Sequence, residues 1–239
     1  MNKIGFIPAR KGSTRFKDKN IKIVAKRPLI YWTVRSAIKS NCFDKIIFSS
    51  DSIKYYRLLL KYLRKDKIKT NLLEFDYREK KYAKNNSKIF DYIKFGLIKK
   101  FSLNESDLIV LMLPTCPLRS IQIIKKSIKL SMNLKKNIFS VTKYDFHLSF
   151  AFKMLRNSWK PLFDNSPLLT GNTQGQRQKI YYHPTGVINC LHVKILKRNY
   201  KSIYYKSSPL ICKQNESVDI DTEDDLDLVT NILNKKFIN

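Results

Sequence analysis

Short apolar segments alternate with amphipathic segments along most of this chain. The apolar segments are typical of buried strands and lie at residues 3–9, 44–51, 71–75, 107–114 and 137–144. The amphipathic segments carry apolar side chains at helical spacing and lie at residues 28–40, 53–65, 87–101, 120–134 and 223–235. Pro28 is expected in the first turn of its helix. This alternation predicts an α/β fold: a doubly wound, mostly parallel, Rossmann-like sheet with helices on both faces.

Residues 145–185 interrupt this alternation. They contain three prolines, several Asn and Gln residues, and many aromatic side chains, including Trp159. We expect a small irregular insertion or hairpin that serves as a lid or as a subunit contact, with a homodimer as the assembly. Regular patterning returns at residues 186–196, and no linker divides the chain. The sequence therefore predicts one domain over residues 1–239 with an insertion at about 145–185.

The net charge of +28 raises the question of nucleic-acid binding. The lysines are dispersed along the chain, and no RNA-reading aromatic motif, zinc finger or KH loop accompanies them. Abundant Lys, Ile and Asn are also typical of an AT-rich genome. We therefore do not expect a nucleic-acid partner.

The apolar runs and the cysteines bear on the compartment. No apolar run approaches the roughly 18–20 residues of a membrane span, so no membrane partner is expected. Arg10 and Lys11 interrupt the first apolar run too early for a secretion signal, which predicts a cytoplasmic location. The four cysteines are widely spaced and are interpreted as ordinary thiols.

A basic loop follows the first predicted strand. It combines Gly12 and Ser13 with five cations, namely Arg10, Lys11, Arg15, Lys17 and Lys19. Parallel sheets bind ligands at the carboxyl ends of their strands, and backbone N–H groups with cationic side chains suit a polyphosphate there. The loop matches neither GxxxxGK[ST] nor GxGxxG. The alternative is a solvated basic loop.

The segments PARKGSTRFKDKNIK and KRPLIYWTV resemble the N-terminal signature of the acylneuraminate cytidylyltransferase family. Three later segments, IIFSSDS, LMLPTCPLR and SVDIDTEDDL, resemble further motifs of that family in the same order. The resemblance covers nearly the whole chain. It implies a nucleotidyltransferase that activates a nonulosonic, sialic-acid-like sugar with CTP to give CMP-sugar and pyrophosphate.

The same resemblance implies roles for individual residues. Nucleotide binding is expected from Arg10, Gly12, Ser13, Arg15, Lys19, Asn20 and Arg78, with Asn20 and Arg78 near the cytosine base. Catalytic roles are expected from Arg10, Lys19 and Asp221. The base site is less well defined, because Glu79 stands where the family usually has proline and Asn85 where it often has an acid.

The resemblance also implies that Asp219 and Asp221 hold Mg²⁺. On an extended segment, residues two apart point to the same side at about 6.5 Å, where two carboxylates repel unless a cation lies between them. The alternative is helix capping, with Thr222 as the cap and acids at 223–225 in the first turn. Capping accounts for those acids but not for the two aspartates that precede them.

Sugar binding is expected at Leu113, Arg177, Gln178, His183, Thr185, Gly186 and Asn189. Several of these depart from the family pattern, most clearly Leu113, which replaces glutamine. His183 could also be structural. The mismatches predict that N-acetylneuraminic acid is not the best substrate and that a deoxygenated, diacylated nonulosonate of the legionaminic or pseudaminic kind fits better.

Two alternatives remain open at this point. One is an enzyme of the same fold that uses another nucleotide or sugar acid, such as a Kdo-type sugar. The other is a non-catalytic protein that binds polyanions through its basic surface.

Overall fold

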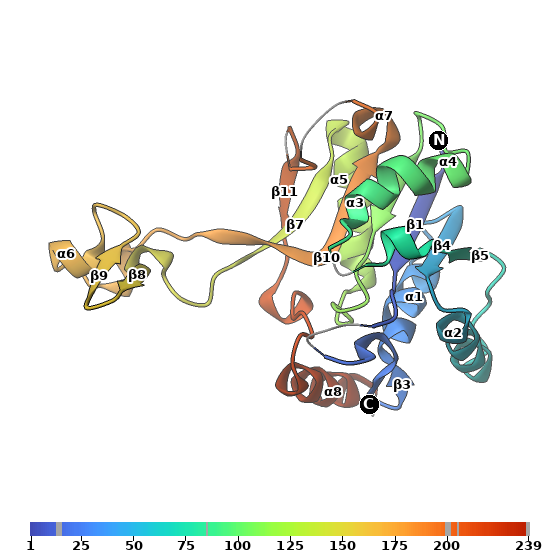
Figure 1. Ribbon diagram of the computed structural model, residues 1–239, viewed down its shortest axis with the longest axis horizontal. Helices are drawn as coiled ribbons and strands as arrows, with labels where there is room; N and C mark the ends of the chain where they lie inside the picture. The colour runs from blue at the N-terminus through green and yellow to red at the C-terminus, as the bar shows by residue number, and fades with distance from the viewer. Residues whose placement is uncertain (13–15, 85, 199–201, 205, 238–239) are drawn as a thin grey trace.

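The computed structural model describes residues 1–12, 16–84, 86–198, 202–204 and 206–237. Seven strands form the central sheet, in the order β11-β7-β10-β6-β1-β4-β5 (Figure 1). Their bounds are β1 Lys3–Pro8, β4 Lys45–Ser50, β5 Leu73–Tyr77, β6 Leu108–Leu111, β7 Ile138–Lys143, β10 Tyr182–His192 and β11 Ser208–Ile211. Only β10 pairs antiparallel with its neighbours in this sheet, β6 and β7. The predicted mostly parallel α/β sheet is confirmed.

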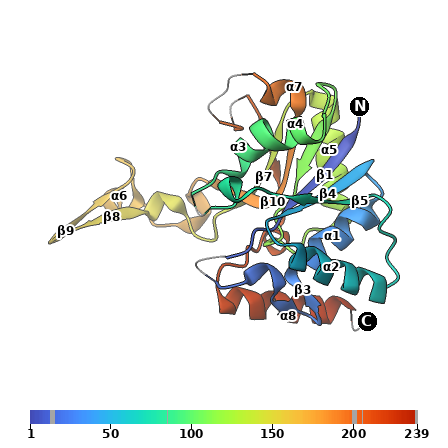
Figure 2. The ribbon, with the colours of Figure 1, turned by 45° about the vertical axis from the view of Figure 1, so that its right-hand side comes forward.

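Helices cover both faces of the sheet (Figure 2). One hydrophobic core receives side chains from α1 Leu29–Ser40, α2 Ile53–Lys65, α5 Ile121–Leu134 and α8 Glu223–Phe237. The other receives them from α3 Ile89–Tyr92, a π-helix at Ile93–Leu97, α4 Ile98–Lys100 and α7 Val193–Leu196. Adjacent strand residues serve opposite cores, as Phe6 and Ile7 do.

The observed elements differ from the predicted ones in small but explicable ways. Pro28 precedes α1 as its N-cap instead of lying in the first turn. The helix expected at 87–101 is one helical run over 89–100 that widens into a π-helix at its centre. The structure also contains a hairpin that the sequence pattern did not predict. Its strands are β2 Ile23–Val24 and β3 Arg27–Pro28, joined by a two-residue turn. Its turn residues have positive φ without the usual glycine or asparagine.

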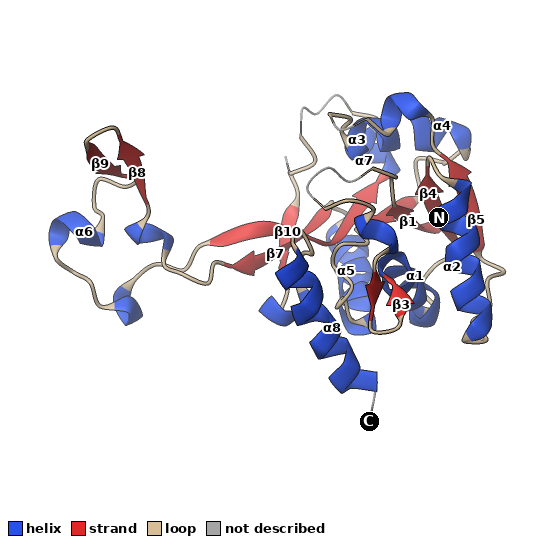
Figure 3. Cartoon of the chain, turned by 60° about the horizontal axis from the view of Figure 1, so that its bottom comes forward, coloured by secondary structure: helices blue, strands red, loops and turns tan. Residues whose placement is uncertain are grey.

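Residues 145–181, called the arm below, project away from the body of the molecule (Figures 1 and 3). The predicted hairpin is present here, formed by β8 Phe152–Leu155 and β9 Ser158–Pro161, followed by α6 Pro167–Thr170. Large apolar side chains are exposed along the arm, at Phe146, Phe152, Met154, Leu155, Trp159, Leu162, Leu168, Leu169 and Ile180.

Two further expectations concern helices and thiols. Among the described residues, no helix has the length and apolar character needed to cross a membrane. All four cysteines are free thiols, as expected.

Candidate nucleotide site

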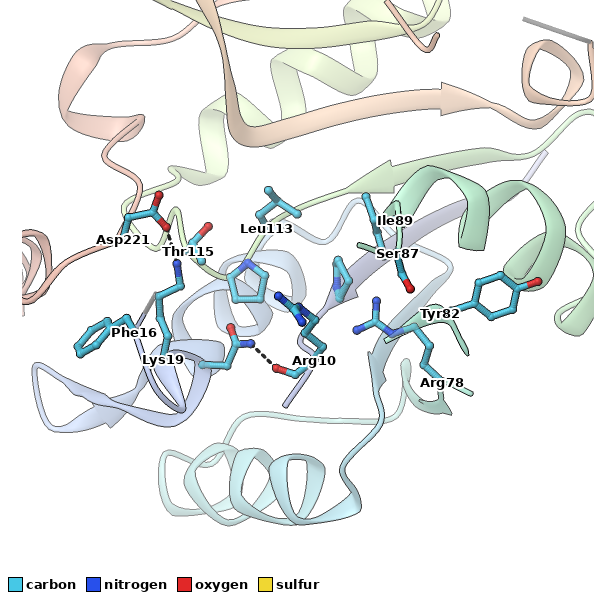
Figure 4. A pocket seen from close by; sticks show the side chains of 13 residues that line it. Arg10, Phe16, Lys19, Arg78, Tyr82, Ser87, Ile89, Leu113, Thr115 and Asp221 are labelled. Carbon is cyan, nitrogen blue, oxygen red and sulfur yellow. Dashed lines mark hydrogen bonds and ion pairs between the residues drawn. The ribbon is translucent and has the colours of Figure 1, made fainter. Parts of the chain in front are cut away.

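A cavity of about 350 Å³ opens at the carboxyl ends of β1, β5 and β6 (Figure 4). Its cationic lining residues are Arg10, Lys19 and Arg78, and Asp221 is its acidic one. Ser87, Ile89 and Leu113 add a less polar wall. Three motifs that are far apart along the chain meet around this cavity, namely PARKGSTRFKDKNIK, LMLPTCPLR and SVDIDTEDDL.

Hydrogen bonds among the described residues fix the basic loop that follows β1. The Lys11 N–H donates to the Asp51 carboxylate at 2.7 Å, the Tyr55 hydroxyl donates to Asp18 at 2.9 Å, and the Asn20 amide donates to the carbonyl of Arg10 at 2.9 Å. The last bond ties the two ends of the loop together. Ser13, Arg15 and Asn85 lie outside the described residues.

Gly12 owes its place in this loop to backbone conformation. Its φ is +75°, a left-handed backbone conformation that favours glycine. Among the described residues, no atom lies within 4 Å of a Cβ added there. Gly12 does not line the cavity in this structure.

Lys19 connects the basic loop with the C-terminal acidic motif. Its ammonium donates to the Asp221 carboxylate at 2.7 Å (Figure 4). It also donates to the Ile220 carbonyl at 2.5 Å. The Ile220 N–H in turn donates to the Thr115 carbonyl at 2.9 Å. Lys19 is buried, and two of the three N–H donors of its ammonium bond to protein groups. The side chain nevertheless lines the cavity.

The acidic motif separates into two functions. Thr222 and Asp225 form a capping pair: the Thr222 N–H donates to Asp225 at 2.9 Å, and the Asp225 N–H donates back to the Thr222 hydroxyl at 3.2 Å. Burial raises the pKa of the Asp225 carboxyl, but hydrogen bonds from the N–H of Asp221 and from Thr222 outweigh burial and lower it below its usual range. Asp225 therefore caps helix α8. Asp219 and Asp221 are not part of this capping pair.

The fit of a metal ion can be tested on these two aspartates. Ile220, between them, is fully buried, whereas Asp219 is exposed and Asp221 partly exposed. Among the described residues, no group of three or more His, Cys, Asp or Glu side chains could hold a metal. Mg²⁺ is usually held by one or two carboxylates together with substrate phosphates and water, so the donor set present is compatible with it.

Arg78 is a buried cation on the side of the cavity opposite Lys19 and Asp221 (Figure 4). Its side chain is 3% exposed, and its Nε has no hydrogen-bond partner among the described residues. Burial lowers the pKa of this guanidinium, and the charge of Arg10 acts in the same direction. Two guanidinium groups that share one cavity favour an anionic ligand between them.

Arg119 has a structural role that the sequence reasoning missed. The guanidinium donates to the carbonyls of Val187, Leu113 (2.9 Å) and Gly186 (3.3 Å), and to the Thr33 hydroxyl (3.0 Å). Complete burial lowers its pKa to about 10. Arg119 thus fastens the end of β6 to β10. The only sequence signal was its place at the end of the LMLPTCPLR motif.

Two residues expected to contact sugar meet beside Arg119. Leu113 lines the cavity, and Gly186 packs against the Leu113 side chain. A Cβ on Gly186 would lie 2.8 Å from Leu113 Cδ1 and 3.0 Å from Cys116 Sγ. Glycine is therefore required by this close approach of β10 to the end of β6.

The other residues expected to contact sugar lie apart from the cavity of the same chain. Thr185 bonds to Ser140, Asn189 is buried opposite Leu111, and the His183 ring packs 4.7 Å from the ring of Tyr144. Arg177 and Gln178 belong to the arm, where the Gln178 amide donates to the carbonyl of Asn172. Among the residues described, the structure therefore places one of the seven, Leu113, on the wall of the cavity.

The structure thus has a mostly parallel sheet and, at the carboxyl ends of three of its strands, a cavity lined by three cationic residues and Asp221. Residues 4–90 match the family model described as cytidylyltransferase. The fold resembles CMP:2-keto-3-deoxy-manno-octonic acid synthetase complexed with CTP, with a TM-score of 0.66, 10% identity, and coverage of 99% of this chain and 100% of that one. At this identity the likeness concerns the fold alone.

Several proteins are similar in sequence over most of this chain. N-acylneuraminate cytidylyltransferase of Escherichia coli is 27% identical over 98% of this chain, which spans only 52% of that relative. Pseudaminic acid cytidylyltransferase of Campylobacter jejuni is 27% identical, with 95% of this chain and 94% of the relative covered. CMP-N,N'-diacetyllegionaminic acid synthase of Legionella pneumophila is 27% identical, with 98% and 97% covered. The resemblance to the acylneuraminate cytidylyltransferase family is confirmed.

Proposed function

We propose that this protein transfers CMP from CTP to a nonulosonic acid and releases pyrophosphate. The observation that carries this proposal is the 2.7 Å contact between Lys19 and Asp221, which joins the basic loop to the acidic motif beside the cavity. This contact supports the proposal that the polyphosphate site and the metal site lie next to each other. The similarity to three enzymes named for sugars of this class supports the choice of substrate.

In the proposed reaction, the anomeric hydroxyl of the sugar attacks the α-phosphorus of CTP. A new P–O bond forms, the bond from the α-phosphorus to the bridging oxygen breaks, and pyrophosphate leaves with the electron pair. The hydroxyl proton passes to solvent. Such transfers depend on positioning and charge neutralisation more than on covalent catalysis. Arg10 and Lys19 would hold the phosphates, and Arg78 would bind the cytosine base.

We further propose that Asp219 and Asp221 hold Mg²⁺. The ion would supply charge neutralisation at the phosphates. Lys19 holds the Asp221 carboxylate at the edge of the cavity, so one of the two acidic groups is already oriented before nucleotide arrives. The third donor of the same ammonium would bind a phosphate oxygen.

The sugar is proposed to be less polar than N-acetylneuraminic acid. Leu113 lines the cavity where the family has glutamine, and it offers neither a donor nor an acceptor. A sugar hydroxyl left unpaired against this wall would cost about 1–3 kcal/mol. A deoxygenated, diacylated nonulosonate avoids that cost.

The arm is proposed to pair with a second copy of the chain. Met154 is 76% exposed and Leu169 58% exposed, and such clustered apolar surface is typical of a protein contact. Arg177 and Gln178 lie on the arm, so a role for them at a sugar requires the cavity of the partner copy. Light scattering after size-exclusion chromatography tests the dimer, with Met154→Lys expected to give a monomer and Lys143→Ala, beside the arm, to leave the dimer intact.

Pyrophosphate release tests the proposed function. Parallel incubations would contain Mg²⁺, a nonulosonic acid and one of CTP, UTP, ATP or GTP, with a Kdo-type sugar acid as a further arm. We expect release with CTP that depends on the nonulosonic acid. Release with another nucleotide, or only with the Kdo-type acid, would support the same fold with a different substrate. Binding of polyanions without any release would support a non-catalytic protein.

A further inference from the structure

Arg78 rests on an aromatic ring that is itself rigidly held. The Cζ atom of Arg78 lies 5.8 Å from the centre of the Tyr92 ring, within the range of a cation–π contact. Tyr92 is 2% exposed, and its ring packs on Tyr82, with centroids 5.0 Å apart, and on Phe6, with centroids 6.2 Å apart. Beyond this ring, the guanidinium has one long hydrogen bond among the described residues, 3.5 Å to the Ser49 carbonyl.

Asp76 fixes the hydroxyl of the same tyrosine. The Tyr92 hydroxyl donates to the Asp76 carboxylate at 2.5 Å, and the same carboxylate accepts from Ser49 Oγ at 2.6 Å and Lys100 Nζ at 2.6 Å. Asp76 is fully buried, and burial of a carboxylate is costly unless donors surround it. The register of the sheet, with Ser49 opposite Asp76, brings these groups together directly beside Arg78.

Gly96 leaves the space that the tyrosine ring occupies. A Cβ at Gly96 would lie 2.6 Å from two carbon atoms of the Tyr92 ring. Gly96 belongs to the π-helix at Ile93–Leu97, which begins immediately after Tyr92. Such π-helical turns are rare and often occur at functional sites.

We infer that Tyr92, Asp76 and Gly96 position Arg78 and thereby set the preference for the nucleotide base. The inference rests on the proposed function, which takes CTP as the nucleotide and assigns Arg78 to the cytosine base. Cytosine presents two adjacent acceptors, O2 and N3, that match the planar donors of a guanidinium, whereas uracil presents a donor at N3. A guanidinium held in one orientation discriminates between them, because the wrong base leaves donors facing each other. Tyr92, Asp76 and Gly96 are therefore positioning residues.

Calorimetry with CTP and UTP on the full chain tests this inference. Tyr92→Leu removes the ring and should weaken CTP binding about 10-fold, with a smaller loss for UTP, so that the preference for CTP falls. Tyr92→Phe keeps the ring but loses the hydrogen bond to Asp76, and it should cause a loss smaller than that of Tyr92→Leu. Gly96→Ala should act in the same direction as Tyr92→Leu and serves where that variant fails to fold. Phe95→Ala, on the exposed side of the same helix, is the matched control and should change neither affinity.

A double-mutant comparison separates positioning from general damage. In an Arg78→Ala background, Tyr92→Leu should cause no further loss of CTP affinity, because its effect passes through Arg78. Equal losses for CTP and UTP, an additive loss in that background, or unchanged binding in both Tyr92→Leu and Gly96→Ala would overturn the inference. If Arg78→Ala binds CTP as the wild type does, the inference fails while sugar-dependent pyrophosphate release still supports the proposed function.

Discussion

The ammonium of Lys19 and the carboxylate of Asp221 lie 2.7 Å apart, although 202 positions separate them in the sequence. The Lys19 side chain is 11% exposed and the Asp221 side chain 38% exposed, so this contact is partly screened by water. Partly exposed ion pairs contribute little to stability. Its importance is the placement of an acidic group at the edge of a cation-lined cavity.

Asp221→Asn should reduce turnover by on the order of 10²-fold or more, because a charged ligand of the proposed metal is lost where charge develops. Glu223→Gln is the matched control and should cost little, since Glu223 lies in the first turn of α8 and does not line the cavity. Steady-state kinetics at saturating CTP measures both. Equal losses in the two variants would contradict the assignment of Asp221.

Arg10→Ala should weaken CTP binding far more than Lys17→Ala does. Both substitutions remove one positive charge from the same loop, but Arg10 lines the cavity and Lys17 is exposed outside it. Calorimetric titration with CTP gives the two affinities. Similar losses would show that the loop acts as a diffuse patch of charge and not as a shaped site.

Arg119→Met should lower the free energy of unfolding by about 3 kcal/mol or more, because it leaves several buried carbonyls unpaired. Lys125→Met, on the exposed side of α5, should change it by less than about 0.5 kcal/mol. Urea denaturation measures both. An Arg119→Met protein as stable as the wild type would show that β6 and β10 hold together without this side chain.

The free energy of unfolding should fall at mildly acidic pH because of His192. Burial lowers the pKa of its imidazole, and Nε2 lies 3.0 Å from Ser131 Oγ. A base with a depressed pKa in the folded state contributes stability above its unfolded pKa of about 6.5, and that contribution is lost as the pH falls below this value. Unfolding measured between pH 7.5 and pH 5 should show this decline, and His192→Gln should flatten it. An unchanged slope in the variant would assign the decline to other groups.

N-acetylneuraminic acid should be a poorer substrate than a legionaminic-type or pseudaminic-type sugar. The reason is the apolar Leu113 on the cavity wall. Leu113→Gln should shift kcat/KM toward N-acetylneuraminic acid by roughly 5- to 150-fold. A wild-type enzyme that clearly prefers N-acetylneuraminic acid would show this interpretation of the pocket to be wrong.

Much of the fold and part of the site could be predicted from sequence. The basic loop with Arg10 and Lys19 was expected at the ligand-binding edge because the carboxyl ends of parallel strands meet at one edge of a sheet. Asp221 was assigned to the same site by family resemblance, since its segment follows no strand directly.

Other features depend on tertiary contacts that a local pattern does not record. Arg119 is charged, and nothing in its surroundings along the chain indicates complete burial among carbonyls. Tyr92 falls within a helical pattern that is equally typical of an ordinary core aromatic. Arg177 and Gln178 were assigned to the sugar by resemblance, whereas the path of the arm carries them away from the cavity of their own chain.

Formation of a CMP-linked sugar is the most direct test of the central claim. The purified protein would be incubated with CTP, Mg²⁺ and a panel of nonulosonic acids, with the product identified by mass spectrometry and pyrophosphate quantified in the same samples. We expect a CMP conjugate and pyrophosphate in equal amounts with at least one nonulosonic acid, and neither without sugar. Bound CTP that yields no conjugate with any sugar of the panel would contradict it.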